Sequence, residues 1–239
     1  MSKQIIFFDT ETTGNTEEDF LCQIAYKTED TSFSEMYKPP KTIPPEASAV
    51  HHISNDMIKD KPIFQESKDF ETIKNLFENE NSIPVAHNAM FDLFMIKKEN
   101  IVPSQFICTL RVAKKLDPEQ KLQKYNLQYL RYALGIEIEA TAHDALGDVL
   151  VLEKLFERLK KKIMTEENTD ENTAIQKMIE ISSVPFLFKT LPFGKYKDMP
   201  LEEIAQKDQA YLEWLLAQKE KNGQLDEDWI YTLKTVLKK

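Results

Sequence analysis

The chain has 239 residues, enough for one full α/β domain and a small additional unit. Hydrophobic residues make up 41% and charged residues 30%, a balance typical of folded soluble proteins and unlike that of disordered ones. No apolar run approaches the roughly 20 residues that cross a bilayer, and the apolar stretch near the start is too short for a signal peptide. We therefore expect a cytoplasmic protein with no membrane partner.

Short apolar stretches rich in isoleucine, valine and phenylalanine predict five strands. The expected strands are 4–8, 20–26, 32–37, 83–86 and 106–108. A polar turn separates the second strand from the third, which predicts an antiparallel meander on the first strand.

Helical spacing of apolar residues and N-cap signals predict helices between and after these strands. The expected helices are 47–50, 54–59, a helix around 70–77, 89–100, 110–116, 127–134, a long helix after 144, and 174–181. Together, the elements predict an α/β fold with a mixed five-stranded sheet flanked by helices. We divide the chain into a main domain at 1–164, a linker and helix at 165–183, and a small C-terminal module at 184–239.

The net charge of −9 argues against a large non-specific nucleic-acid surface. Residues 97–131, however, carry eight basic and three acidic side chains, a local net charge of +5. A solvated helical face and a track that guides a phosphate backbone explain this segment about equally well.

Two carboxylates, Asp9 and Glu11, follow the first predicted strand directly. They alternate with Thr10, so in an extended backbone both point to the same side. A tripeptide of this kind is weak evidence alone, but carboxylates next to a buried strand are costly unless a cation pairs with them. We therefore predict a metal site there, with Thr10 and Thr12 close to the substrate.

Asp92 is expected at the first turn of the helix that begins after Asn88. A lone aspartate there is most simply a residue that favours the helix dipole. The neighbouring Asn88 offers a polar contact, and Phe91 offers a surface for a base or sugar, so we predict a substrate site that includes all three.

His143 and Asp148 are five residues apart, and on one regular helix they would point about 140° apart. If the histidine precedes the helix and the aspartate lies one turn inside it, both can face one cleft. Taken alone, His143 is more simply a satisfied surface histidine.

Together, these motifs resemble the DEDDh family of 3′→5′ exonucleases. The motifs are Asp9-Thr10-Glu11-Thr12, His87-Asn88-Ala89-Met90-Phe91-Asp92, and His143 with Asp148. The segment Ala49-Val50-His51-His52-Ile53-Ser54 is similar to a further stretch of that family, and residues 193–215 resemble the tail of its exodeoxyribonuclease X subgroup. The loop after Gly14, residues 15–19, is polar and acidic. This composition argues against a loop that wedges apolar side chains into a duplex end.

The resemblance implies a ribonuclease-H-like fold and a 3′–5′ exodeoxyribonuclease that releases nucleoside 5′-monophosphates, in DNA repair or degradation. It implies two ions, Mg²⁺ or Mn²⁺, held by Asp9, Glu11, Asp92 and Asp148, with His143 deprotonating water. The expected partners are DNA 3′ ends.

Two alternatives stay open at this stage: an RNA-directed exonuclease of the same family, and a non-catalytic nucleic-acid-binding module. In the C-terminal module, Lys195, Tyr196 and Lys197 either touch phosphates and bases or belong to a docking element that completes the core or a homodimer contact. We slightly prefer the second interpretation.

Overall fold

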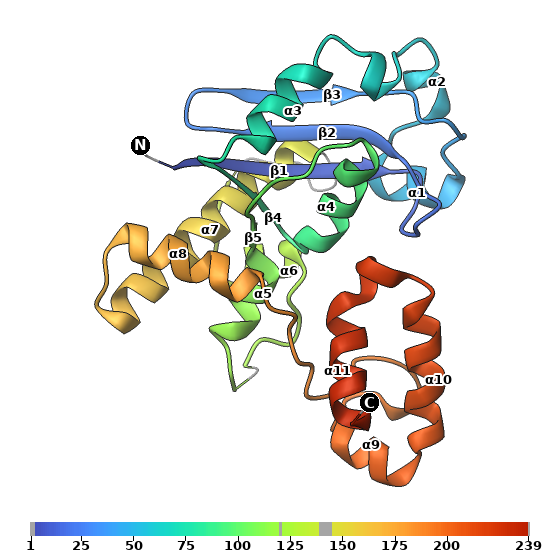
Figure 1. Cartoon of the computed structure of the whole chain (residues 1–239), viewed down its shortest axis with the longest axis vertical. Helices are drawn as coiled ribbons and strands as arrows, with labels where there is room; N and C mark the ends of the chain where they lie inside the picture. The colour runs from blue at the N-terminus through green and yellow to red at the C-terminus, as the bar shows by residue number, and fades with distance from the viewer. Residues whose placement is uncertain (1–2, 120, 139–144, 239) are drawn as a thin grey trace. The chain divides into compact units, whose positions relative to one another are not determined.

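A computed structural model describes residues 3–119, 121–138 and 145–238. The chain divides into two compact units, Met1–Ser183 and Val184–Lys239, which are drawn in Figure 1. In the described part of the chain, no helix is long and apolar enough to pass through a bilayer.

The first unit is built on a five-stranded mixed sheet with the order β3-β2-β1-β4-β5 (Figure 1). Its strands are β1 Gln4–Thr12, β2 Leu21–Lys27, β3 Ser32–Met36, β4 Ser82–Ala86 and β5 Ile107–Cys108. The first three strands form the expected antiparallel meander, and β1, β4 and β5 run parallel. The predicted fold class is confirmed.

The central strand β1 is longer than the sequence indicates. We expected it to end at Phe8, before the acidic residues, but it continues to Thr12. The extension forms because β2 pairs with every residue from Phe7 to Thr12, with an irregularity between Glu11 and Thr12. The ladder with β2 pairs the backbone N–H and C=O groups of residues 9–12, so this segment forms a strand although its side chains are polar.

Side chains alternate across β1 and reach two separate apolar layers. Phe8 is fully buried and packs edge-on against Phe77 at 5.1 Å, within the layer that includes the helices α3 (Phe70–Glu78) and α4 (Ala89–Lys98). Phe7 lies on the opposite face and packs against Phe156 of helix α7 (Ala145–Glu167) at 5.2 Å. Burial on both faces explains why this strand reads as a continuous apolar run.

Helices cover both faces of this sheet. They are α1 Pro45–His51, α2 Asn55–Ile58, α3 Phe70–Glu78, α4 Ala89–Lys98, α5 Thr109–Lys115, α6 Leu127–Ala133, α7 Ala145–Glu167 and α8 Glu171–Ser182, with a short 3₁₀ turn, η1, at Phe64–Glu66. α7 packs on β1 and β2 and also contacts α5, α6 and α8. The predicted 165–183 segment thus consists of the end of α7, a three-residue connection and α8.

The second unit has a small core of its own. Its elements are η2 Gly194–Tyr196, α9 Leu201–Lys207, α10 Gln209–Glu220, η3 Gly223–Asp226 and α11 Glu227–Leu237. Leucines from these helices, among them Leu201, Leu212 and Leu233, are fully buried together. Trp229 stacks on Phe188 with ring centroids 4.0 Å apart, which ties α11 to the segment before α9.

Candidate active site

The strand β1 sends its polar side chains to two faces. Thr10 and Thr12 are buried and continue the face of Phe8, whereas Asp9 and Glu11 continue the face of Phe7. Because Phe7 packs on α7, alternation places Asp9 and Glu11 on the side of the sheet that α7 covers.

Asp92 approaches β1 from the other helix layer. It lies in the first turn of α4, as predicted, and only 3% of its surface is exposed. Its Oδ1 accepts hydrogen bonds from the Thr10 N–H at 3.0 Å and from the Thr10 hydroxyl at 2.7 Å. Burial raises the pKa of the Asp92 carboxyl to about 7, although the bonds from Thr10 lower it.

Asp148 lies in the first turn of α7 and is 9% exposed. Its Oδ1 accepts a hydrogen bond from Nε2 of Gln128, the second residue of α6. Asp148 and Phe156 are two turns apart on one helix, and Phe156 packs on Phe7. Asp9, Glu11 and Asp148 therefore belong to the same layer of the fold.

The carboxylate set has the chemistry that hard divalent ions prefer, since every donor is an oxygen. Among the described residues, no three carboxylate, imidazole or thiolate groups stand close enough to hold one ion as they lie. The predicted base, His143, lies outside the described residues, so the structure does not place it.

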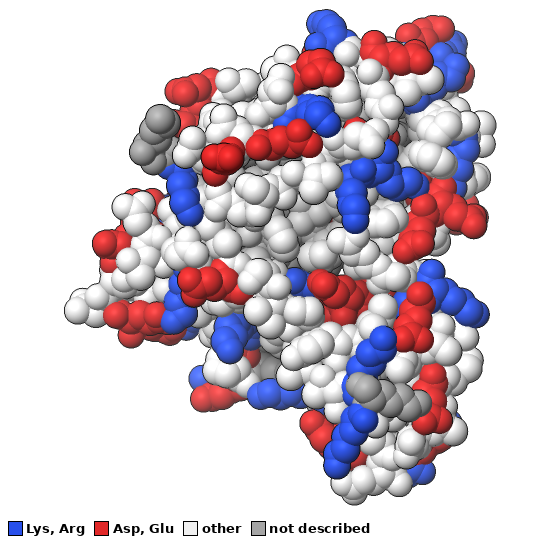
Figure 2. Space-filling model, viewed as in Figure 1, with Lys and Arg blue, Asp and Glu red and all other residues white. Residues whose placement is uncertain are grey.

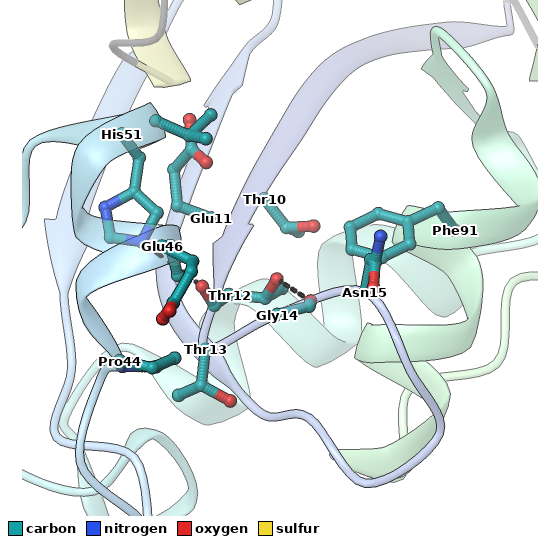
Figure 3. Close-up of a pocket in the computed structure, with 12 residues that line it drawn as sticks. Thr10, Glu11, Thr12, Thr13, Gly14, Asn15, Pro44, Glu46, His51 and Phe91 are labelled. Atoms are coloured by element: carbon teal, nitrogen blue, oxygen red, sulfur yellow. Dashed lines mark hydrogen bonds between the residues drawn. The ribbon is translucent and has the colours of Figure 1, made fainter.

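A cavity of about 380 Å³ opens beside Glu11, the one of these four carboxylates that lines it (Figure 3). One wall is the end of β1 with the following turn, and the opposite wall is helix α1. It is lined by Thr10, Glu11, Thr12, Thr13, Gly14, Asn15, Pro44, Glu46, Ala47, Val50, His51 and Phe91. Thr10, Thr12 and Phe91, which we predicted to contact the substrate, all line it.

Asn88 is not among the residues that line this cavity. It occupies the N-cap position of α4 as expected, but in the left-handed conformation, with φ 65° and ψ 44°, and its side chain makes no capping bond. Because the backbone enters the helix from that conformation, the side chain does not reach the N–H groups of the first turn.

The sequence interpretation missed the contribution of helix α1 to this cavity. Glu46, Ala47 and Val50 line it, and the family-like stretch around His51 was the available signal. The His51 Nδ1 accepts the Ile53 N–H at 3.0 Å, so Nε2 carries the hydrogen and donates it to the Thr12 carbonyl at 3.2 Å (Figure 3). Burial lowers the pKa of His51, consistent with this neutral form.

The polar loop after Gly14 is held by a buried carboxylate. Asp19 accepts hydrogen bonds from Thr13 and Thr16 and pairs with Lys41 at 2.6 Å. Burial alone would raise the pKa of Asp19, but these donors outweigh it and hold the pKa below the usual value. Lys98 donates to two loop carbonyls and lies 4.2 Å from the Phe20 ring.

His87, the first residue of the second sequence motif, has a structural role. Its Nε2 lies 2.6 Å from the Tyr125 carbonyl and its Nδ1 lies 2.9 Å from the Thr109 hydroxyl. The ring therefore connects the end of β4 to the start of α5 and to the segment before α6. Burial lowers its pKa to about 4.

The basic segment 97–131 is only partly available to a phosphate backbone. Arg111 is 2% exposed and donates to the Ser182 carbonyl at 2.6 Å, and Arg131 donates to the Ile138 carbonyl at 2.6 Å. Figure 2 shows basic and acidic side chains interspersed over the visible face. The exposed cations of this segment are Lys97, Lys115, Lys121 and Lys124.

In the second unit, Lys195 and Tyr196 share one acceptor. Both donate to Asp208 Oδ2 at 2.8 Å, and the Lys195 Nζ lies 4.7 Å from the Tyr196 ring and 5.0 Å from the Tyr211 ring. These contacts agree with the structural interpretation of the two side chains.

Two family models match the chain: one described as Exonuclease (RNase T) over residues 6–156, and one described as Exodeoxyribonuclease X-like C-terminal over residues 191–220. The chain belongs to the exonuclease family. It is a 3′–5′ exonuclease that acts on DNA, and exonucleases of this kind depend on divalent metal ions.

Individual relatives agree with this assignment. The chain is 31% identical to Exodeoxyribonuclease 10 of Escherichia coli over 184 residues, which covers 76% of this chain and 75% of that protein. It is 33% identical to the DNA polymerase III subunit epsilon of Treponema pallidum over 162 residues, covering 62% of this chain and 73% of that protein.

Solved structures share the fold. Exonuclease X in complex with 5′ overhanging duplex DNA has a TM-score of 0.56 and 25% identity, covering 74% of this chain and 99% of that one. Escherichia coli Exonuclease I in complex with a dT13 oligonucleotide has a TM-score of 0.58 and 18% identity, covering 70% of this chain and 43% of that one.

Proposed function

We propose that the exonuclease removes nucleotides at the β1 carboxylates, with Asp9, Glu11, Asp92 and Asp148 holding two divalent ions, Mg²⁺ or Mn²⁺. When bound, such ions neutralise phosphate charge and stabilise the attacking and leaving oxygens. The support is local: Asp9 and Glu11 share the α7 layer with Asp148, and Asp92 is bonded to the residue between them.

The burial of Asp92 supports this role. A carboxyl whose pKa is raised to about 7 by burial is costly to ionise unless a cation lies beside it. Asp148 is also buried, and it lies on α7, the helix on the side of the sheet that Asp9 and Glu11 face. All four carboxylates thus lie on β1 or on the first turns of helices that pack against it.

The cavity between β1 and α1 is the proposed binding site of the terminal nucleotide. Its volume of about 380 Å³ lies within the range of about 300–1,000 Å³ typical of ligand pockets. A terminal nucleotide in it would rest against Phe91 and Val50, with Thr12 and Thr13 near its sugar and its phosphate directed to Glu11. Asn15 and Glu46 would surround the base with polar groups.

In this arrangement, water attacks the terminal phosphodiester and His143 takes its proton. The bond to the 3′ oxygen of the preceding nucleotide breaks, and a nucleoside 5′-monophosphate leaves. Because a histidine must be neutral to act as a base, the rate should rise with pH if His143 has this role. We also expect a role in DNA repair or degradation; action on RNA 3′ ends and formation of a homodimer stay predictions.

Paired substitutions test the assignment of residues. His143→Ala should lower the rate by about 10²–10⁴-fold, the usual contribution of a general base. Asp9→Ala should be more damaging, because it removes an ion ligand. Wild-type digestion of a 3′-labelled oligonucleotide by both variants would refute the proposed mechanism.

The products test the reaction itself. The assay incubates the enzyme with DNA and RNA oligonucleotides of one sequence, each blocked at the 3′ or the 5′ end. Mass spectrometry then identifies the products. We expect nucleoside 5′-monophosphates from DNA with a free 3′ end and none when that end is blocked. Release from the 5′ end, or of 3′-monophosphates, would contradict the proposed chemistry.

A further inference from the structure

Gln128 makes a contact that links α6 to a proposed metal ligand. It is the second residue of α6, and its Nε2 donates a hydrogen bond to Asp148 Oδ1. α6 packs directly on α7, so the contact joins two helices that are separated in the sequence by residues 134–144. A neutral donor in this position restricts the rotation of the carboxylate without cancelling its charge.

The other end of the same amide is unusual. Gln128 Oε1 is buried and has no hydrogen-bond partner in the part of the chain that the structure describes. Buried amide oxygens nearly always accept a hydrogen bond, from protein or from ordered water. Since Nε2 and Oε1 are attached to one carbon, the bond to Asp148 also fixes the direction of this acceptor.

Gln105, in the same unit, has the contacts of an ordinary structural glutamine. Gln105 Nε2 donates to the Glu80 carbonyl at 3.0 Å and lies 3.2 Å from the Ser82 carbonyl, binding only backbone. It lies before β5, at the end of the parallel strands opposite to Asp92. Gln128 instead binds a site carboxylate, and its Oε1 has no hydrogen-bond partner among the described residues.

We propose that Gln128 is a positioning residue of the exonuclease: its N–H orients Asp148, and its Oε1 accepts a hydrogen bond from water that enters with the divalent ion. Groups that orient metal ligands in this way tune the affinity of the site for its ion. The inference rests on the proposed role of Asp148 as a metal ligand.

The test replaces Gln128 by methionine, which has a similar length and neither donor nor acceptor. Calorimetric titration with Mn²⁺, without DNA, should show about tenfold weaker binding than in the wild type. The rise in melting temperature that Mn²⁺ produces should shrink accordingly, because ion binding stabilises the folded state in proportion to occupancy. Melting in EDTA reports the intrinsic stability of the variant separately.

Gln105→Met is the matched control, because it too deletes a side-chain amide. The Gln105 amide, however, binds backbone carbonyls away from the site. It should leave the Mn²⁺ affinity unchanged. If Gln128→Met binds Mn²⁺ as tightly as this control, the positioning role is wrong.

Asp148→Asn separates this failure from failure of the proposed function. If Asp148→Asn weakens Mn²⁺ binding but Gln128→Met does not, only the role of Gln128 is refuted. If Asp148→Asn binds Mn²⁺ like the wild type, the proposed ligand set fails as well. If the role is correct, adding Gln128→Met to Asp148→Asn should cause little further loss.

Discussion

Thr10 donates two hydrogen bonds to the same oxygen of Asp92, one from its N–H at 3.0 Å and one from its hydroxyl at 2.7 Å. The two residues are 82 positions apart in the sequence, and their contact fixes the start of α4 to the end of β1. Thr10 therefore lines the cavity and also orients a proposed metal ligand.

Thr10→Val should lower the exonuclease rate about tenfold, because it keeps the shape and strand preference of threonine but removes the hydroxyl that holds Asp92. Thr10→Ser retains the hydroxyl and should stay within a few-fold of the wild type. Thr28→Val is the control, since the buried Thr28 hydroxyl accepts the Thr31 N–H in the β2–β3 turn. The kcat and KM values on a 3′-labelled oligonucleotide provide the measurement; equal rates for Thr10→Val and Thr28→Val would contradict this role.

Gly14→Ala should raise the KM for the oligonucleotide more than it changes kcat. A Cβ at Gly14 would stand 2.5 Å from the Asp19 carboxylate, so the loop that lines the cavity must shift. Asp19→Asn should act similarly, because it weakens the pair with Lys41 that holds this loop. For either variant, the free energy of unfolding should fall by about 1–3 kcal/mol.

Gly135→Ala is a suitable control for that experiment. A Cβ there meets nothing within 4 Å, so the substitution costs only the strain of a left-handed residue, about 1 kcal/mol. Steady-state kinetics and thermal unfolding should show lost stability with unchanged KM. A KM for Gly14→Ala equal to that of Gly135→Ala would show that the loop does not bind substrate.

The stability of the first unit should fall below pH 6.5 because of His87. Its pKa is about 4 in the folded chain and 6.5 for the unperturbed side chain, so the unfolded state binds more protons between these values. The contribution of the neutral ring is complete above pH 6.5 and is lost as pH falls through 4, by up to about 3 kcal/mol.

His87→Gln removes this titration while keeping a donor and an acceptor. Its free energy of unfolding should therefore decrease less between pH 7 and pH 4.5 than that of the wild type. Urea unfolding at several pH values measures the difference. Parallel curves for the two proteins would show that His87 titrates normally.

Truncation should depend sharply on whether Ser182 is kept. The Ser182 hydroxyl accepts the Cys108 N–H at 2.8 Å and its carbonyl accepts from the buried Arg111 at 2.6 Å. Residues 1–183 should fold and retain exonuclease activity, whereas residues 1–181 should lose about 1–3 kcal/mol for each buried donor left without its acceptor. Thermal unfolding of both fragments, with activity as a second readout, distinguishes them; equal melting temperatures would refute the argument.

The sequence carried enough information for the sheet and for the positions of several candidate site residues on their elements. The apolar run Ile5–Phe8 between turn signals identifies the central strand, and the alternation Asp9-Thr10-Glu11 places both acids on one face. The helical start after β4 correctly put Asp92 in the first turn of α4. These features follow from the local pattern of apolar and polar residues, which the sequence shows without knowledge of the fold.

The C-terminal limit of β1 was beyond that local information. Residues 9–12 are polar, and only the ladder with β2 makes them a strand. The limit of the strand therefore depends on a hydrogen-bond partner that lies elsewhere in the chain.

Tertiary structure also decided which polar groups perform which task. Arg111 counts as a surface cation in the sequence, yet it is buried against Ser182, 71 residues away. Thr10, His87 and Gln128 acquire their partners through contacts between different elements. Sequence patterns fix which face a side chain occupies because that depends on backbone geometry alone, whereas a hydrogen-bond partner depends on how distant elements pack, and only the folded chain determines that.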